Sequence, residues 1–171
     1  MNVVFDLDGT LADNSHREHF LQGEKKDWDA FFEASDGDLP IWPAINTLVA
    51  LDSTLDRARW KNRIEIWSGR GSGANGSVRR KTIRWLNKHI TVTLHIRPDP
   101  HPEFFYTDAA VDLRMRDHTD YTQDQDLKKR WLDEARAQGN PPDLVFDDRQ
   151  KVVDMWRAEG IPCFQVAPGD F

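Results

Sequence analysis

The chain has 171 residues, of which 39% are hydrophobic and 30% are charged, and its formal net charge at pH 7 is −6. This length and composition fit one folded domain with a sizeable core. The net negative charge argues against broad adhesion to nucleic acid by bulk charge, although it allows a local basic groove. No apolar run of about 18 residues occurs, so we expect no transmembrane helix.

Cysteine usage and the first residues bear on the cellular compartment. Cys163 is the single cysteine, which excludes an internal disulfide. The first residues lack the basic and apolar segments of a secretory signal. We therefore expect a cytoplasmic protein.

Short apolar segments alternate with segments of helical period along the chain. The expected strands are 2–7, 63–68, 91–96, 143–147 and 161–166, and the expected helices are 43–60, 76–89, 124–138 and 150–159. Strands that alternate with helices in this way predict an α/β fold built on a parallel sheet with crossover connections.

Two segments interrupt this alternation. Residues 13–42 are polar with several aromatic side chains, and residues 97–123 are rich in proline and charge. Each follows the expected carboxyl end of a strand, where open α/β sheets bind their ligands. We interpret both as cap-like or lid-like insertions within a single domain that spans residues 1–171.

The first strand ends in the most informative motif of the chain. Asp6 and Asp8 follow an apolar run, and Gly9 and Thr10 come next. Alternate side chains of a strand point to one side, so the two carboxylates could together hold a divalent cation, and one could attack a phosphorus atom. Thr10 would offer a hydroxyl group and a backbone N–H to a phosphate. An ordinary Asp-Gly turn is the alternative, which the complete motif disfavours.

The second strand ends in Ser68, Gly69 and Arg70. A serine hydroxyl can donate to a phosphate oxygen, a glycine allows close approach of the backbone, and an arginine can grip phosphate with its planar fork. Taken alone, this segment fits a Gly/Ser-rich loop about equally well.

The fourth strand ends in Asp147 and Asp148. With Asp6 and the backbone of Asp8, these carboxylates can complete a site for Mg²⁺, which prefers a few protein oxygens together with water and phosphate. One of the two could instead cap the helix 150–159.

Lys128 lies near the start of the helix that precedes the fourth strand. If it reaches the centre of the site, its charge screens the nucleophile from the phosphate. Asp124 lies one turn earlier on the same helical face and could orient it. A solvated lysine on a charged helix is the alternative.

Together, these motifs resemble the haloacid dehalogenase (HAD) phosphohydrolase superfamily, whose four motifs occur here in order. The resemblance implies a Rossmann-like parallel sheet with helices on both faces. It also implies roles: Asp6 as the nucleophile that forms an aspartyl-phosphate, Asp8 as general acid and then base, and Ser68 and Lys128 as phosphoryl-binding groups. Asp148 would be the main acidic Mg²⁺ ligand, with Asp147 beside it.

A closer resemblance is to the 3′-phosphatase domain of bacteriophage polynucleotide kinase-phosphatases. It rests on segments 26–29, 68–73, 147–157 and 165–171. In that family two arginines assist the reaction, and the matching positions are Arg17 and Arg70. An acidic residue one turn before the lysine also matters there, and Asp124 matches it.

The resemblance implies a Mg²⁺-dependent phosphomonoesterase that removes 3′-phosphate from polynucleotide ends or nucleotides. One alternative is a small-molecule phosphatase of the same chemistry that acts on (deoxy)nucleoside monophosphates, which the net acidity favours. Another is a catalytically silent module that binds nucleic-acid ends, which the intact motif set disfavours. No Gly-x-x-x-x-Gly-Lys-Ser/Thr motif occurs in these residues, so we expect no 5′-kinase activity from them. A separately encoded kinase or ligase is a candidate partner.

Overall fold

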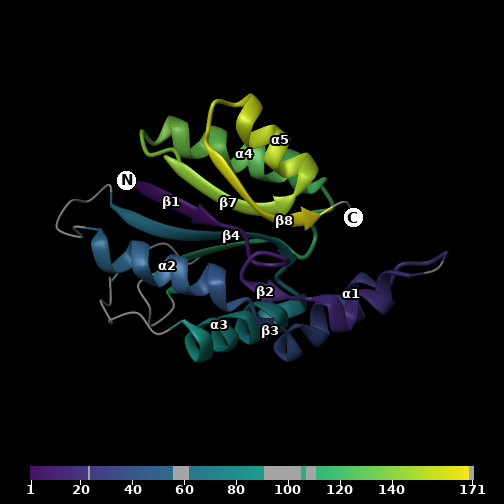
Figure 1. Ribbon diagram of the computed structural model, residues 1–171. Helices are drawn as coiled ribbons and strands as arrows, with labels where there is room; N and C mark the ends of the chain where they lie inside the picture. The colour runs from purple at the N-terminus through teal and green to yellow at the C-terminus, as the bar shows by residue number, and fades with distance from the viewer. Residues whose placement is uncertain (23, 56–61, 91–104, 107–110, 170–171) are drawn as a thin grey trace.

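The fold is known from a computed structural model that describes residues 1–22, 24–55, 62–90, 105–106 and 111–169. Within these residues the main sheet has six strands in the order β5–β6–β4–β1–β7–β8 (Figure 1). They are β1 (Asn2–Phe5), β4 (Arg63–Gly71), β5 (Phe105–Tyr106), β6 (Asp112–Arg116), β7 (Leu144–Arg149) and β8 (Cys163–Gly169). Neighbouring strands pair in parallel, except that the short β5 pairs antiparallel with β6. The predicted parallel α/β sheet is confirmed.

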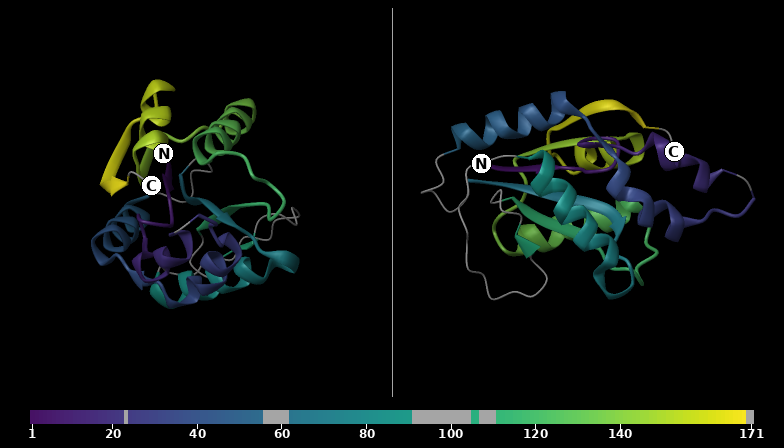
Figure 2. Two further views of the ribbon diagram at one scale, coloured as in Figure 1. Left: turned by 90° about the vertical axis from the view of Figure 1, so that its right-hand side faces the viewer. Right: turned by 90° about the horizontal axis from the view of Figure 1, so that it is seen from below.

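Helices cover both faces of this sheet, as predicted. On one face lie α2 (Trp42–Thr54) and α3 (Ser77–His89), and on the other lie α4 (Asp124–Ala137) and α5 (Gln150–Ala158). Figures 1 and 2 show the two helical layers with the sheet between them.

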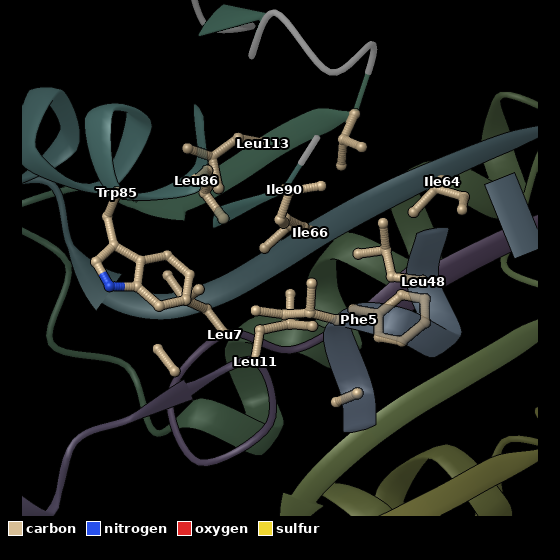
Figure 3. Packing of buried hydrophobic residues seen from close by; sticks show 14 of the residues in the cluster. Phe5, Leu7, Leu11, Leu48, Ile64, Ile66, Trp85, Leu86, Ile90 and Leu113 are labelled. Carbon is tan, nitrogen blue, oxygen red and sulfur yellow. The ribbon is translucent and has the colours of Figure 1, made fainter. Parts of the chain in front are cut away.

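Alternation along β1 builds the two cores. Val3 and Phe5 face the α2 and α3 side, whose core cluster is drawn in Figure 3. Val4 faces the opposite side, where it joins apolar residues of α4 and α5. All three side chains are almost fully buried, because β1 lies in the interior of the sheet with helices over both faces.

The expected strands 2–7, 63–68, 143–147 and 161–166 correspond to β1, β4, β7 and β8, with bounds that differ by at most three residues. The helices 76–89, 124–138 and 150–159 correspond to α3, α4 and α5. The helix expected over 43–60 is α2, which ends at Thr54. The strand expected at 91–96 and the last residues of the expected helix 43–60 lie outside the described residues.

The interpretation of 97–123 as one cap-like insertion was wrong for residues 112–116. Residues 112–116 form β6, which pairs in parallel with β4 inside the main sheet. The physical reason is a period of two: Leu113 and Met115 are buried, and the charged residues that alternate with them are half-buried. Those charges hid the strand pattern in a segment that is polar overall.

The segment after β1 forms a small unit of its own. It comprises β2 (Ala12–Asp13), η1 (Ser15–Leu21), α1 (Trp28–Glu33), η2 (Ala34–Gly37) and β3 (Leu39–Pro40), where η marks a 3₁₀ helix. β2 and β3 pair antiparallel. The Asp27 side chain caps α1 by accepting from the backbone N–H of Ala30 at 3.0 Å. In Figure 1, α1 projects on the side toward which β1 points.

Six tryptophans lie in the described residues. Four of them are buried, at 5% exposure or less: Trp67, Trp85, Trp131 and Trp156. Trp28 and Trp42 are exposed. In the part of the chain that the structure describes, no helix is long and apolar enough to cross a membrane.

Candidate active site

The loop after β1 places two carboxylates at the carboxyl edge of the sheet. The Asp6 N–H donates to the Phe146 carbonyl oxygen at 2.8 Å, which ties the loop to β7. Gly9 has a φ of +80°, and a Cβ atom there would lie 2.2 Å from Oδ2 of Asp148. Both the backbone conformation and the close approach of Asp148 therefore require glycine.

Lys128 joins the acidic residues at the centre of the site. Its Nζ lies 2.7 Å from Oδ1 of Asp6 and 2.8 Å from Oδ2 of Asp147. Asp124, one turn earlier on α4, has an oxygen 3.9 Å from the same Nζ. Burial alone would lower the pKa of Lys128, but the charges of these carboxylates raise it well above its usual value. Lys128 is therefore a permanent cation.

Asp6, Asp147 and Asp148 are buried, and each offers an oxygen within 4.8 Å of the others. Burial raises the pKa of Asp6 well above its ordinary value; Lys128 opposes this and the neighbouring carboxylates add to it. Burial and then Asp147 raise the pKa of Asp148 to about 6. One ammonium group does not balance three buried carboxylates, so this donor set fits a divalent cation such as Mg²⁺.

Asp8 has the opposite electrostatic surroundings. Its Oδ2 accepts from Nε of Arg70 at 3.1 Å, and its Oδ1 accepts from Nη2 of both Arg70 and Arg17. Burial alone would raise the pKa of Asp8, but the charges and hydrogen bonds of Arg70 and Arg17 hold it well below its usual range. Both oxygens of the Asp8 carboxylate are paired with the arginines. A metal would therefore bind the backbone oxygen of Asp8, as the sequence analysis suggested.

Asp38 is a site residue that sequence reasoning missed. It lies just after η2 and is 3% exposed. Its carboxylate accepts from Nε of Arg17 at 2.7 Å and from Nη2 of Arg70 at 2.8 Å, so it bridges the two guanidinium groups that hold Asp8. The Trp85 indole donates to the Asp38 carbonyl oxygen at 2.7 Å. The segment 35–38 looks like an ordinary polar turn, and no local signal marks this carboxylate.

Ser68 and Gly69, near the end of β4, contact Arg70 and Asp124. Ser68 is fully buried, and its Oγ accepts from the Arg70 backbone N–H at 3.1 Å. A Cβ atom at Gly69 would lie 1.9 Å from Oδ1 of Asp124. The same Asp124 oxygen accepts from Nη2 of Arg116 at 3.0 Å, and Nε of Arg116 donates to the Gly69 carbonyl oxygen at 2.6 Å. Gly69 thus allows Asp124 to lie against the strand.

A cavity of about 950 Å³ opens over these groups. Of the predicted site residues, six line it: Asp6, Asp8, Gly69, Arg70, Asp124 and Asp148. The others lie behind these and contact them or one another: Thr10, Arg17, Ser68, Lys128 and Asp147. The structure therefore brings every predicted residue into one cluster.

Thr10 differs in detail from expectation. Its hydroxyl group donates to Oδ1 of Asp148 at 3.4 Å, and its N–H donates to the Leu7 carbonyl oxygen at 3.3 Å. Both groups that we expected to meet a phosphate have protein partners. In this structure Thr10 supports the acidic cluster.

The parallel sheet, with its acidic cluster at the strand ends, defines a phosphatase domain of the HAD type. The chain belongs to the family described as the polynucleotide kinase PNKP phosphatase domain, whose model matches residues 1–171. A chain from the solved structure of the Pnkp1/Rnl/Hen1 RNA repair complex is 31% identical with a TM-score of 0.68, over 99% of this chain and 43% of that one. A chain from a second Pnkp1/Rnl/Hen1 structure is 31% identical with a TM-score of 0.67, over 99% of this chain and 47% of that one.

This chain therefore spans less than half the length of the chains in those two structures. The likeness extends over nearly all of its own residues, so it concerns the whole phosphatase fold and not one motif.

Proposed function

We propose that this chain is a Mg²⁺-dependent phosphatase that removes 3′-phosphate from nucleic-acid ends through an aspartyl-phosphate intermediate. One observation carries the proposal: Asp6 and Asp8, two residues apart, have opposite surroundings. Asp6 lies beside Lys128 in the acidic cluster, whereas Asp8 lies between two arginines. Two carboxylates whose surroundings push their pKa values apart are suited to different tasks at one reacting centre.

Asp6 is the nucleophile. One of its carboxylate oxygens attacks the phosphorus atom in line, and the bond from phosphorus to the leaving 3′-oxygen breaks. Lys128, which pairs with Asp147 at the same time, keeps a positive charge beside the reacting atoms. Asp6, Asp147 and Asp148 would hold Mg²⁺, which supplies charge stabilisation for the transferred phosphoryl group.

Asp8 acts as the general acid and then as the general base. Without substrate its low pKa keeps it ionised between Arg17 and Arg70. When a phosphate dianion enters, the arginines can donate to the phosphoryl oxygens, and the added negative charge raises the pKa of Asp8. Asp8 then takes up a proton from solvent and donates it to the leaving 3′-oxygen. As a carboxylate again, it takes a proton from the water that hydrolyses the aspartyl-phosphate.

The nucleic-acid substrate is supported by the family and by the RNA repair complexes in which the similar chains were solved. On the same grounds we infer that the protein acts with separately encoded end-processing partners, such as a kinase or ligase. The alternative, a mononucleotide phosphatase, is favoured by the net charge of −6 and by acidic side chains in the cavity lining, among them Glu18 and Asp29.

The test compares the wild type with Asp6→Asn on a 3′-phosphorylated oligonucleotide, a 3′-mononucleotide and a 5′-mononucleotide, with phosphate release as the readout. We expect the highest kcat/KM on the oligonucleotide, loss of activity with EDTA, and no turnover by Asp6→Asn, which keeps the same shape. Turnover by Asp6→Asn at the wild-type rate would refute the nucleophile assignment. A preference for the 5′-mononucleotide would favour the alternative substrate.

A further inference from the structure

Two exposed aromatic side chains line the cavity above the reacting carboxylates. Trp28, at the start of α1, is 43% exposed, and Tyr121, between β6 and α4, is 88% exposed. They come from separate segments of the chain, since α1 follows β1 and Tyr121 follows β6. Neither side chain belongs to the hydrophobic clusters of the fold. Packing of the core therefore does not account for an aromatic residue at either position.

Trp28 is held on a supported platform. Its ring contacts Phe31 edge-on and Phe32 at a tilt, each with a centroid separation of 5.8 Å. The Arg17 guanidinium lies over the Phe31 ring, 4.1 Å from its centroid. The indole is thus one aromatic ring away from the arginine that contacts Asp8, which fixes its position relative to the phosphoryl site.

Cationic side chains stand among the acidic ones of the cavity lining, where they could contact a phosphodiester chain. Nζ of Lys26 lies 5.7 Å from the centroid of the Trp28 ring, and Lys26 and Lys151 both line the cavity. Two of the acidic lining residues are already paired, Glu33 with Lys81 and Asp120 with Arg130. Aromatic faces interleaved with cationic side chains are the usual means of binding an unpaired nucleic-acid strand.

We propose that Trp28 and Tyr121 stack on nucleobases at the 3′ end of the substrate, so that the enzyme selects base-bearing strand ends by their aromatic faces. The inference rests on the proposed function, because a 3′-phosphate held at Asp6 directs its own nucleoside outward into the cavity. Every base has a π-face, so recognition of this kind tolerates any sequence.

The test uses two 3′-phosphorylated oligonucleotides of equal length, one with all its bases and one with abasic residues at the last two positions. Trp28→Ala and Tyr121→Ala should each lower kcat/KM on the complete strand by about 5- to 150-fold, the value of one base–aromatic stack. On the abasic strand the penalty should shrink to that of the control. Trp28→Phe and Tyr121→Phe, which keep a ring, should recover most of the loss.

Trp42→Ala is the matched control, because Trp42 is 53% exposed on α2 and is not among the residues that line the cavity. An equal penalty on both strands would overturn the stacking proposal, since it would indicate general damage to the site. Absence of any penalty on the complete strand would also overturn it. If the wild type cleaves 5′-mononucleotides but neither strand, the proposed function itself fails and the stacking proposal with it, which distinguishes the two failures.

Discussion

Arg17 and Asp38 form a buried bidentate ion pair, with Nε of Arg17 2.7 Å from Oδ1 of Asp38 and Nη2 2.8 Å from Oδ2. Both side chains are inaccessible to solvent. The same Nη2 contacts Asp8, so the carboxylate of Asp38 fixes the guanidinium that contacts Asp8. Arg70 has the same arrangement, with Nη2 shared between Asp8 and Asp38. Asp38 is thus a positioning residue for both arginines.

Asp38→Asn should lower both stability and activity. The amide keeps the shape of the side chain but cannot balance two buried guanidinium groups, and removal of one member of a buried ion pair costs about 3–5 kcal/mol. We expect the free energy of unfolding in urea to fall by about 3 kcal/mol. The loss of fixed arginines should lower kcat/KM at least about tenfold.

Asp36→Asn is the control for this substitution, since Asp36 lies two residues before Asp38, within η2, and is exposed. It should leave both quantities near the wild-type values. If Asp38→Asn behaves like Asp36→Asn, Asp38 does not position the arginines.

Some site residues were predictable because the sequence around each one has a strand pattern, whereas Asp38 has no such pattern. Asp6, Ser68 and Asp147 each lie near the carboxyl end of an apolar strand. The carboxyl ends of parallel strands meet at one edge of a sheet, so their convergence follows from the strand pattern. Asp38 has no such pattern: its two partners lie 21 and 32 residues away in sequence. Only the folded chain shows that this carboxylate is buried.

β6 was missed for a different reason: its alternating strand pattern is present, but charged residues make the segment polar overall. Leu113 and Met115 alternate with charged residues, which is the period of a strand. Arg114 is accommodated because its guanidinium lies over the Trp131 ring of α4, 4.7 Å from the centroid. A cation–π contact of this kind lets a charged residue occupy a strand that a helix covers.

Mg²⁺ should stabilise the protein through the acidic cluster. A ligand that binds only the folded state adds about 2.7 kcal/mol at 100 times its dissociation constant, so the melting temperature should rise with Mg²⁺ and fall back with EDTA. Asp148→Asn should abolish the rise. Asp126→Asn, an exposed carboxylate on α4, should keep it. An equal rise in wild type and Asp148→Asn would place the cation elsewhere.

The same effect should depend on pH. The pKa of Asp148 in the cation-free fold, about 6, lies above its ordinary value of 3.8, so ionisation of this group destabilises the cation-free fold at neutral pH. That penalty is relieved as the pH falls below about 6, where protons compete with Mg²⁺ for the carboxylate. The Mg²⁺-dependent rise in melting temperature should therefore be larger at pH 8 than at pH 5. A rise that does not change with pH would contradict this linkage.

Cys163 should react slowly in the folded protein. It is 8% exposed, and burial, with a further contribution from Asp147, raises the pKa of its thiol to about 12. At pH 8 only about one thiol in 10⁴ is then a thiolate, the reactive form. Iodoacetamide should label Cys163 readily in urea and barely in buffer. Rapid labelling of the native protein would show that β8 opens easily.

Gly69→Ala should displace Asp124 and weaken the site from behind. The new Cβ would lie 1.9 Å from Oδ1 of Asp124, so the carboxylate must move away from Arg116 and Lys128. Overpacking of this kind costs about 1–3 kcal/mol, and kcat/KM should fall at least about tenfold because Lys128 loses its orienting partner. Urea unfolding and phosphate release measure the two effects.

The double variant Gly69→Ala with Asp124→Ala separates the clash from the loss of Asp124. Removing the carboxylate removes the clash, so the two substitutions should be non-additive in stability, with the pair less destabilised than the sum. Activity should stay low, because Asp124 is absent. Gly71→Ala is the matched control on β4: its Cβ would meet the Phe32 ring at 3.3 Å, which a small ring shift relieves. Additive stabilities in the double variant would show that Gly69 matters for some reason other than room for Asp124.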